Sequence, residues 1–339
     1  MVLELTDSLC QYSSIEECDV LSCITNILIG YYEGNFLLMA TENICDFFKD
    51  KVSESRAIQA LVYLKNNCSF SYDVKFFFKI VINDNLNDQY ELPLSFFKKT
   101  SSIQPISILG ENTSDITFFT RITEELFPQT KLKYNIVNGG GSDTGNTLAN
   151  LQKRFIFILV IIDSDKKYIN AEYGDTYNSV EKAYNKKLKH VTFYPLDVHE
   201  IENLLPFSFL LTTTNKEGKN FLKRLKKDNH AKEILRYYDI KNGIKLKDIK
   251  DNVLYFQFAK LIYDKIYANK KNNFEKFISI KIKNSNTQIF PGIRKNAMQK
   301  FLEEKTPKMD INFFKKELEE IAELIVTLAC GRNDDPINL

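Results

Sequence analysis

The sequence predicts an α/β protein in which a parallel sheet of about four strands is flanked by helices. Residues 155–162 form a wholly apolar run, which is typical of a strand buried on both faces of a parallel sheet. Strand-like and helix-like patterns alternate from residue 106 to residue 196, as crossover connections require. We expect this central domain, residues 104–206, to lie between an N-terminal α+β accessory domain (1–103) and a mostly helical region (207–339).

The elements follow from apolar spacing and turn signals. In the N-terminal region, apolar residues recur at helical spacing in 53–65, and residues 74–82 have a strand-like pattern. In the central region we expect strands at 106–110, 134–137, 155–162 and 191–196, with helices at 114–126, 144–154 and 177–188. In the C-terminal region we expect helices at 221–238, 253–268 and 313–328.

Bulk composition narrows the class of protein. The chain has 339 residues, which suggests two or three domains, and an ordinary apolar content of 44%. Its longest apolar run, around 155–162, is too short to cross a bilayer, and the first residues lack the pattern of a signal peptide. We therefore expect a cytoplasmic protein with no membrane partner. Its six cysteines lack close CxxC pairs, so we expect free buried thiols, with a disulfide or metal role as the alternative.

Charge is distributed unevenly along the chain. Residues 207–339 carry 27 Lys+Arg and 17 Asp+Glu, a net charge of +10, whereas the net charge of the whole chain is +2. A basic region beside acidic loops is typical of proteins that hold a polyanion near a metal ion. We expect nucleic acid, DNA or RNA, as a partner. The alternative is that lysine simply fills the surface of a chain that is rich in lysine throughout.

Carboxylates stand where two expected strands end. Glu111 follows the strand at 106–110, and Asp163 and Asp165 follow the run at 155–162. Ligands of open parallel sheets bind beyond the carboxyl ends of the strands, and carboxylate oxygens suit Mg²⁺. A spacing of two would put Asp163 and Asp165 on one side of an extended chain. We expect Mg²⁺ here, with Mn²⁺ as an alternative, although an isolated Asp-x-Asp is also common turn chemistry.

A third acidic group, His199-Glu200-Ile201-Glu202-Asn203, follows the expected strand at 191–196. If this segment is helical, Glu200 and Glu202 cannot share one face, because neighbours two apart point in different directions. We favour Glu202 as the metal-facing acid.

A glycine-rich loop, Gly139-Gly140-Gly141, joins an expected strand to an expected helix. Glycines let a backbone approach a phosphate closely, and amides at a helix N-terminus attract it. It is not a Walker A loop, because no Gly-Lys-Ser/Thr follows. A plain flexible loop is the alternative. Lys166 and Lys167 are further phosphate-binding candidates, or else solvated surface lysines.

The order of these groups resembles the Toprim (topoisomerase–primase) superfamily. More narrowly, it is similar to the OLD-family nucleases and to the PARIS-type anti-phage Toprim effectors. The residues that carry the likeness span about 100 of the 339 positions: Gly110-Glu111 with Ser114-Asp115, Gly139-Gly140-Gly141, Asp163-Ser164-Asp165 and Glu200-Ile201-Glu202-Asn203. The resemblance implies a Toprim-like Rossmannoid sheet in which Glu111, Asp163 and Asp165 are the metal-associated acids and Glu202 is a further candidate.

The expected function is that of a Mg²⁺-dependent Toprim endonuclease that cleaves DNA or tRNA, as an effector in anti-phage defence. Asp163 and Asp165 would hold the metal, and Glu111 would bind a metal or act as a general acid or base. The alternative is a Toprim-like regulatory subunit, silent alone and controlled by an ATPase partner, since this sequence has no P-loop. A homo-oligomer is a further possible assembly.

Overall fold

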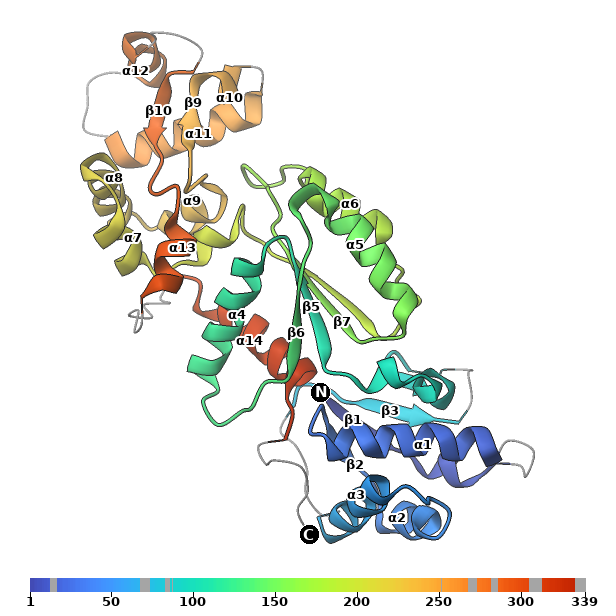
Figure 1. Cartoon of the computed structure of the whole chain (residues 1–339). Coiled ribbons are helices and arrows are strands. Elements are labelled where there is room, and N and C mark those ends of the chain that lie inside the picture. Colours follow the sequence, from blue (N-terminus) through green and yellow to red (C-terminus); the bar gives the residue numbers. More distant parts are fainter. Residues whose placement is uncertain are drawn as a thin grey trace. The chain divides into compact units, whose positions relative to one another are not determined.

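The computed structural model describes residues 1–12, 17–67, 74–82, 86, 88–250, 252–267, 273–281, 286–304 and 313–332 (Figure 1). The chain divides into two compact units. Unit 1 combines Met1–Ile161, Ser179–Tyr194 and Glu319–Leu339, and unit 2 combines Ile162–Asn178 and Pro195–Leu318. The expected domains 1–103, 104–206 and 207–339 stay predictions.

Unit 1 contains a first four-stranded sheet with the order β2 (Leu37–Met39), β1 (Val2–Leu5), β3 (Phe78–Val81) and β4 (Glu91–Pro93). All three strand pairings are parallel. The helices of this region are α1 (Glu17–Tyr32), α2 (Glu42–Lys49) and α3 (Ser55–Asn66). The expected α+β arrangement is therefore wrong here, and the region is α/β. Strands of three or four residues are too short for their sequence to show the direction of pairing.

The second sheet confirms the expected parallel sheet of four strands. Its order is β6 (Tyr134–Asn138), β5 (Ile106–Gly110), β7 (Ile158–Ile162) and β8 (Val191–Pro195). β5 pairs in parallel with both β6 and β7. Every residue of β5 and β7 is buried, as the apolar runs predict.

The helices around this second sheet are α4 (Thr113–Leu126), α5 (Thr144–Leu151) and α6 (Asp175–Ala183), followed much later by α14 (Lys315–Ala329). Figure 1 shows α4 and α5 on opposite sides of the sheet. α4 begins with a capping box in which the side chain of Asn112 accepts from a backbone amide and the amide of Asn112 donates to Asp115, at 3.0 Å. This cap fixes the start of α4 directly after β5 and Glu111.

Both sheets have the same strand order, which reads 2-1-3-4 when each sheet's strands are numbered along the chain. The chain therefore reverses its winding direction at the first strand of each sheet. In open parallel sheets such a reversal marks the place where ligands bind, beyond the carboxyl ends of the strands. In the second sheet, Glu111 follows β5 and Asp163 follows β7, the two strands at that reversal.

The part of unit 2 that follows residue 206 is mostly helical, as expected for the C-terminal region. The elements of unit 2 after β8 are a 3₁₀ turn (Ile201–Leu204), α7 (Phe207–Thr213), α8 (Lys216–Leu225), α9 (Ala231–Tyr237), β9 (Gly243–Lys245), α10 (Leu246–Lys250), α11 (Val253–Tyr267), α12 (Phe274–Lys281), β10 (Gln288–Pro291) and α13 (Ala297–Glu303). β9 and β10 pair antiparallel. The single helix expected at 221–238 is two helices, because Asp228 accepts the amide of His230 at 2.8 Å and turns the chain between them.

The described cysteines are only in part buried as expected: Cys23, Cys45 and Cys330 are buried, Cys10 is half-buried and Cys18 is exposed. In the described part of the chain, Cys10, Cys18, Cys23, Cys45 and Cys330 form no disulfide. Cys68 lies outside the described residues, as does Ala268, the last residue of the helix expected at 253–268.

Candidate metal centre

The loop after β7 carries the first two acids of unit 2 and is fixed by hydrogen bonds. Asp163 and Asp165 flank Ser164, whose buried hydroxyl donates to the carbonyl of Val198. The amide of Asp165 donates to the carbonyl of His199 at 2.9 Å. These bonds hold the Asp-Ser-Asp loop against the segment that follows β8. The Asp-Ser-Asp loop and the segment at Val198 and His199, which are 34 residues apart in the sequence, therefore lie side by side.

Asp165 itself has a left-handed backbone conformation, with φ of 54°. The chain is therefore not extended through the second aspartate, and a spacing of two does not by itself place both carboxylates on one side, as the sequence reasoning assumed. Gly174 allows this conformation to fit. A Cβ added to Gly174 would lie 2.3 Å from Oδ2 of Asp165 and 2.4 Å from its Cβ.

The segment after β8 differs from the expected helix in its first residues. Glu200 has an extended backbone, with φ of −142° and ψ of 159°, and caps the 3₁₀ turn that starts at Ile201. The side chain of Asn203 returns to this cap, where it accepts the amide of Glu200 at 2.8 Å. Because Glu200 precedes the turn rather than lying within it, the argument that Glu200 and Glu202 must point in different directions does not hold.

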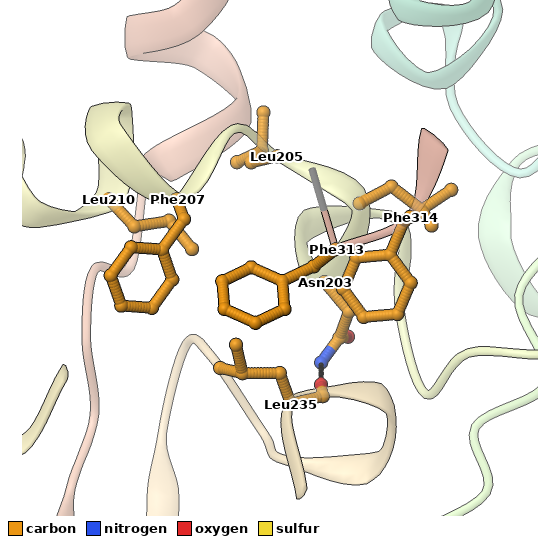
Figure 2. A pocket seen from close by; sticks show the side chains of 8 residues that line it. Asn203, Leu205, Phe207, Leu210, Leu235, Phe313 and Phe314 are labelled. Atoms are coloured by element: carbon orange, nitrogen blue, oxygen red, sulfur yellow. Dashed lines mark hydrogen bonds between the residues drawn. The ribbon is translucent and has the colours of Figure 1, made fainter. Parts of the chain in front are cut away.

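Asn203 also fixes the segment after α9. Its buried Nδ2 donates to the carbonyls of Leu235 and Tyr238, the second at 2.7 Å, and Figure 2 shows the bond to Leu235. The carbonyl of Arg236 accepts the amide of His199 at 2.7 Å. The end of α9 is thereby fastened to the start of the 3₁₀ turn, which brings Asp239 and Lys241 to Glu200.

Lys241 forms ion pairs with both glutamates. Its Nζ lies 3.1 Å from Oε2 of Glu200 and 3.0 Å from Oε2 of Glu202, and its backbone amide donates to Oε1 of Glu200 at 3.2 Å. Glu200 and Glu202 are both buried, whereas the side chain of Lys241 is 38% exposed. One ammonium therefore balances two buried carboxylates.

This arrangement changes the pKa of both partners. Burial raises the pKa of Glu200 to about 7, with smaller contributions in the same direction from the charges of Glu202 and Asp239, while Lys241 opposes the shift. Burial lowers the pKa of Lys241, but the two glutamates raise it by more, so its pKa lies above the ordinary value. Lys241 therefore stays charged at neutral pH.

His199 adds a nitrogen donor to this group. One ring nitrogen of His199 and one carboxylate oxygen each from Glu200 and Asp239 lie within 4.8 Å of one another. His199 is buried, and its Nδ1 has no hydrogen-bond partner. Burial lowers the pKa of His199, so its imidazole is neutral at pH 7 and able to bind a metal ion.

Sequence reasoning missed Asp239 and Lys241, which follow Glu200 by about 40 positions. Neither belongs to an acidic group or to a recognised motif. One available signal was Asn242-Gly243, a typical turn pair, because Asp239 accepts the amide and the side chain of Asn242 and so shapes this turn.

In unit 1, Glu111 is held by the glycine-rich loop. The amides of Gly140 and Gly141 donate to the carbonyl of Glu111 at 3.2 and 3.3 Å, and the amide of Gly139 donates to Gly110 at 2.8 Å. A Cβ on Gly139 would lie 2.3 Å from the hydroxyl of Thr144, so only glycine fits there. These amides thus support the residues after β5, and phosphate binding by them stays a prediction.

The two lysines after the Asp-Ser-Asp loop differ. Nζ of Lys166 lies 3.8 Å from the centre of the Tyr173 ring, a cation–π contact, and its side chain is half-buried. Lys167 is exposed. Of the two, Lys167 is the one available to a phosphate without leaving a contact.

A small pocket in unit 2 lies next to Asn203. It is lined by Leu205, Phe207, Leu210, Leu235, Phe313 and Phe314, among others, and these side chains surround it in Figure 2. Its volume of about 10 Å³ is room for roughly one water molecule. The pocket is a packing gap beside the acidic group and too small to bind a substrate.

The chain matches none of the family models, curated proteins or solved structures with which it was compared. Among the residues that the structure describes, no helix is both long enough and apolar enough to cross a membrane.

Proposed function

We propose that this chain is a divalent-metal-dependent nuclease of the Toprim type. The proposal rests on the hydrogen bonds between the loops that follow β7 and β8. These bonds bring Asp165 close to His199 and Glu200 within unit 2. Carboxylates that meet at the carboxyl end of a parallel sheet are typical of metal-dependent phosphoryl chemistry. The resemblance to Toprim nucleases rests on the same loops.

The donor set fits a hard cation. Asp163 and Asp165 offer carboxylate oxygens, the ligands that Mg²⁺ prefers, and Mn²⁺ accepts the same donors. A bound ion would lower the pKa of a water molecule and offset the charge that develops on a phosphodiester. The resemblance to Toprim nucleases implies that Glu111, in unit 1, is a further ligand or a general acid or base. Lys167 would neutralise a neighbouring phosphate.

The nucleic-acid partner is supported by α8. Its buried side contains Phe221, Leu222 and Leu225, while its exposed side carries lysines four positions apart, at Lys219 and Lys223, and the row continues to Lys227 just beyond the helix. Residues four apart lie on one face of a helix. A row of lysines on one face matches the regular charge of a phosphate backbone, which it would bind without reading sequence. As an anti-phage effector, such an enzyme would cleave DNA or tRNA.

The test is cleavage of plasmid DNA and of a tRNA pool in the presence of Mg²⁺ or Mn²⁺. We expect Asp163→Asn and Glu111→Gln to abolish cleavage with the fold intact. The matched control is Glu172→Gln, which removes an exposed acid of unit 2 and should leave cleavage unchanged. Full activity in both Asp163→Asn and Glu111→Gln would refute the assignment.

A second candidate is a Toprim-like regulatory subunit that is silent until an ATPase partner releases it. The ion pairs of Lys241 favour it, because they balance Glu200 and Glu202 without a metal ion. Co-purification of an ATPase, with cleavage only after its removal, would support this candidate. A lone chain that cleaves at full rate would exclude it.

A further inference from the structure

We propose that His199, Glu200 and Asp239 form a binding site for a transition-metal ion of the Zn²⁺ class, in addition to the Mg²⁺ proposed at Asp163 and Asp165. All three residues belong to unit 2, and one donor atom of each lies within 4.8 Å of the others. The site stands on the geometry of these three donors, and its occupation can be measured whether or not the chain cleaves nucleic acid.

The unpartnered nitrogen of His199 is the observation that points to a ligand. A buried polar atom without a hydrogen-bond partner costs about 1–3 kcal/mol, so native structures rarely keep one without a reason. Nδ1 of His199 is such an atom, in a side chain that is only 7% exposed. A metal ion bound to Nδ1 would give this atom a partner. A metal ion bound to the other ring nitrogen would fix the orientation of the ring that carries the unpartnered atom.

The carboxylates are oriented as metal ligands usually are. Both oxygens of Asp239 accept hydrogen bonds from Asn242, one from its amide and one from its side chain at 3.2 Å. Asn203 holds the backbone of Glu200. Hydrogen bonds of this kind from a second layer fix the direction of metal-binding groups and raise affinity. Each carboxylate oxygen has two lone pairs and keeps one for an ion.

The donor types select the metal. Zn²⁺ binds both imidazole nitrogens and carboxylate oxygens, and imidazole also suits other late first-row ions. Mg²⁺ prefers oxygen ligands and keeps much of its water. The positive charge of Lys241 lies 3.1 Å from Glu200, which weakens the binding of a cation held mainly by charge. The neutral imidazole of His199 binds Zn²⁺ through its nitrogen lone pair, so this part of the affinity does not require a further negative charge.

A second buried histidine provides the comparison. Nε2 of His190 in unit 1 also lacks a hydrogen-bond partner, but its ring lies 4.8 Å from that of Phe96. Among the described residues, the group of metal-binding side chains that includes a histidine contains His199 and not His190. His190 and His199 are therefore both buried, and each has an unpartnered ring nitrogen. Only His199 of these two also has two carboxylates nearby, those of Glu200 and Asp239.

The experiment uses the full chain, stripped of metal with a chelator and then titrated with Zn²⁺ or Mg²⁺. The chain has only three histidines, so a spectrum of the imidazole Hε1 protons has three resonances, which His→Gln variants assign. We expect the His199 signal to shift and to saturate at one Zn²⁺ per chain, while those of His190 and His230 stay in place. Mg²⁺ at the same concentration should not produce the shift of the His199 signal that Zn²⁺ produces.

Two variants test the ligands. Asp239→Asn keeps the shape of the side chain at a half-buried position and should weaken Zn²⁺ binding by roughly tenfold or more. His190→Gln is the matched control and should bind Zn²⁺ as the unmodified chain does. An equal response of all three histidines, the same shift with Mg²⁺, or unchanged affinity in Asp239→Asn would overturn the site. None of these outcomes depends on cleavage, so failure here leaves the nuclease proposal standing.

Discussion

The amide of Asp165 donates a 2.9 Å hydrogen bond to the carbonyl of His199, and this bond joins the loops that follow two neighbouring strands. It is formed between main-chain atoms, so it survives substitution of either side chain. The acidic side chains of these two loops can therefore be substituted one at a time while the main-chain bond between the loops remains.

Asp165→Gly should separate stability from function. Asp165 has a φ of 54°, a conformation that glycine adopts without the steric cost that other residues bear. We expect the free energy of unfolding to stay the same or to rise by about 1 kcal/mol, while metal-dependent cleavage is lost with the carboxylate. Urea unfolding and the plasmid assay measure the two effects. Asp163→Gly is the control, since Asp163 does not have a positive φ, and it should lower stability.

Lys241→Met should destabilise unit 2 because it leaves two buried glutamates without their ammonium. Hydrogen bonds and ion pairs to charged groups contribute about 2 kcal/mol each at buried sites, and the partial exposure of Lys241 reduces this figure. We expect a loss of roughly 1–3 kcal/mol. Adding Glu202→Gln should restore part of it, since only one carboxylate then remains. Strictly additive losses in this double-mutant cycle would show that the two residues are not coupled.

Asn203→Ala should lower both stability and metal affinity. Three hydrogen bonds of Asn203 fasten Glu200 to the end of α9, and their loss leaves buried backbone groups unpaired. We expect unfolding to become easier by about 2–4 kcal/mol and metal binding to weaken by roughly ten- to a hundredfold. The control is Asn215→Ala, which removes the N-cap of α8 at a cost of about 1 kcal/mol. An equal loss of metal affinity in that control would mean that general destabilisation explains the effect.

His190 should make stability depend on pH. Burial lowers its pKa from 6.5 to about 4, so between these values the unfolded chain binds a proton that the folded chain does not. This contribution to stability is fully present above pH 6.5 and is lost as the pH falls towards 4, by up to about 3 kcal/mol. We expect His190→Leu to flatten the stability curve in this range when urea unfolding is measured at a series of pH values. Identical slopes in both proteins would contradict the assignment.

Neutralising the α8 lysines should weaken nucleic-acid binding and its salt dependence. Each phosphate contact contributes about one unit to the slope of log affinity against log salt. We therefore expect Lys219→Gln combined with Lys223→Gln to reduce that slope by up to about two. The matched control, Lys186→Gln with Lys187→Gln, removes the same charge from exposed positions of unit 1. Equal effects of the two pairs would indicate that net charge alone governs binding.

Long apolar strands of the second sheet were predictable, and the short strands of the first were not. β5 begins and ends as predicted, because its five residues are all buried and glycine ends the run. β7 starts at Ile158 rather than at residue 155, because Phe155 takes a left-handed conformation at the end of the preceding turn. The first sheet pairs strands of three and four residues, and nothing local to them shows that β1 lies between β2 and β3.

The candidate site was predictable only as far as its acids follow strands. Asp165 and the acidic segment after β8 stand in recognisable positions, so topology alone suggested that they belong together. Within that segment the sequence favoured Glu202, whereas Glu200 is the glutamate that lies with His199 and Asp239. Asp239 and Lys241 lie beside Glu200 only because of the three-dimensional position of the end of α9. That position is set by the hydrogen bonds of Asn203 to Leu235 and Tyr238, which join residues 32 and 35 positions apart.

Unit 1 includes residues 319–332, so it is complete only after these residues have been translated. The amino group of Met1 hydrogen-bonds to the carbonyl of Cys330, and the amide of Lys133 donates to Ala329 at 2.7 Å. During translation, the ribosome releases all of residues 162–318 before it releases the segment that completes unit 1. Unit 2 can therefore reach its final structure on the nascent chain. Unit 1, whose first residues are translated earlier, can do so only after α14 has been released.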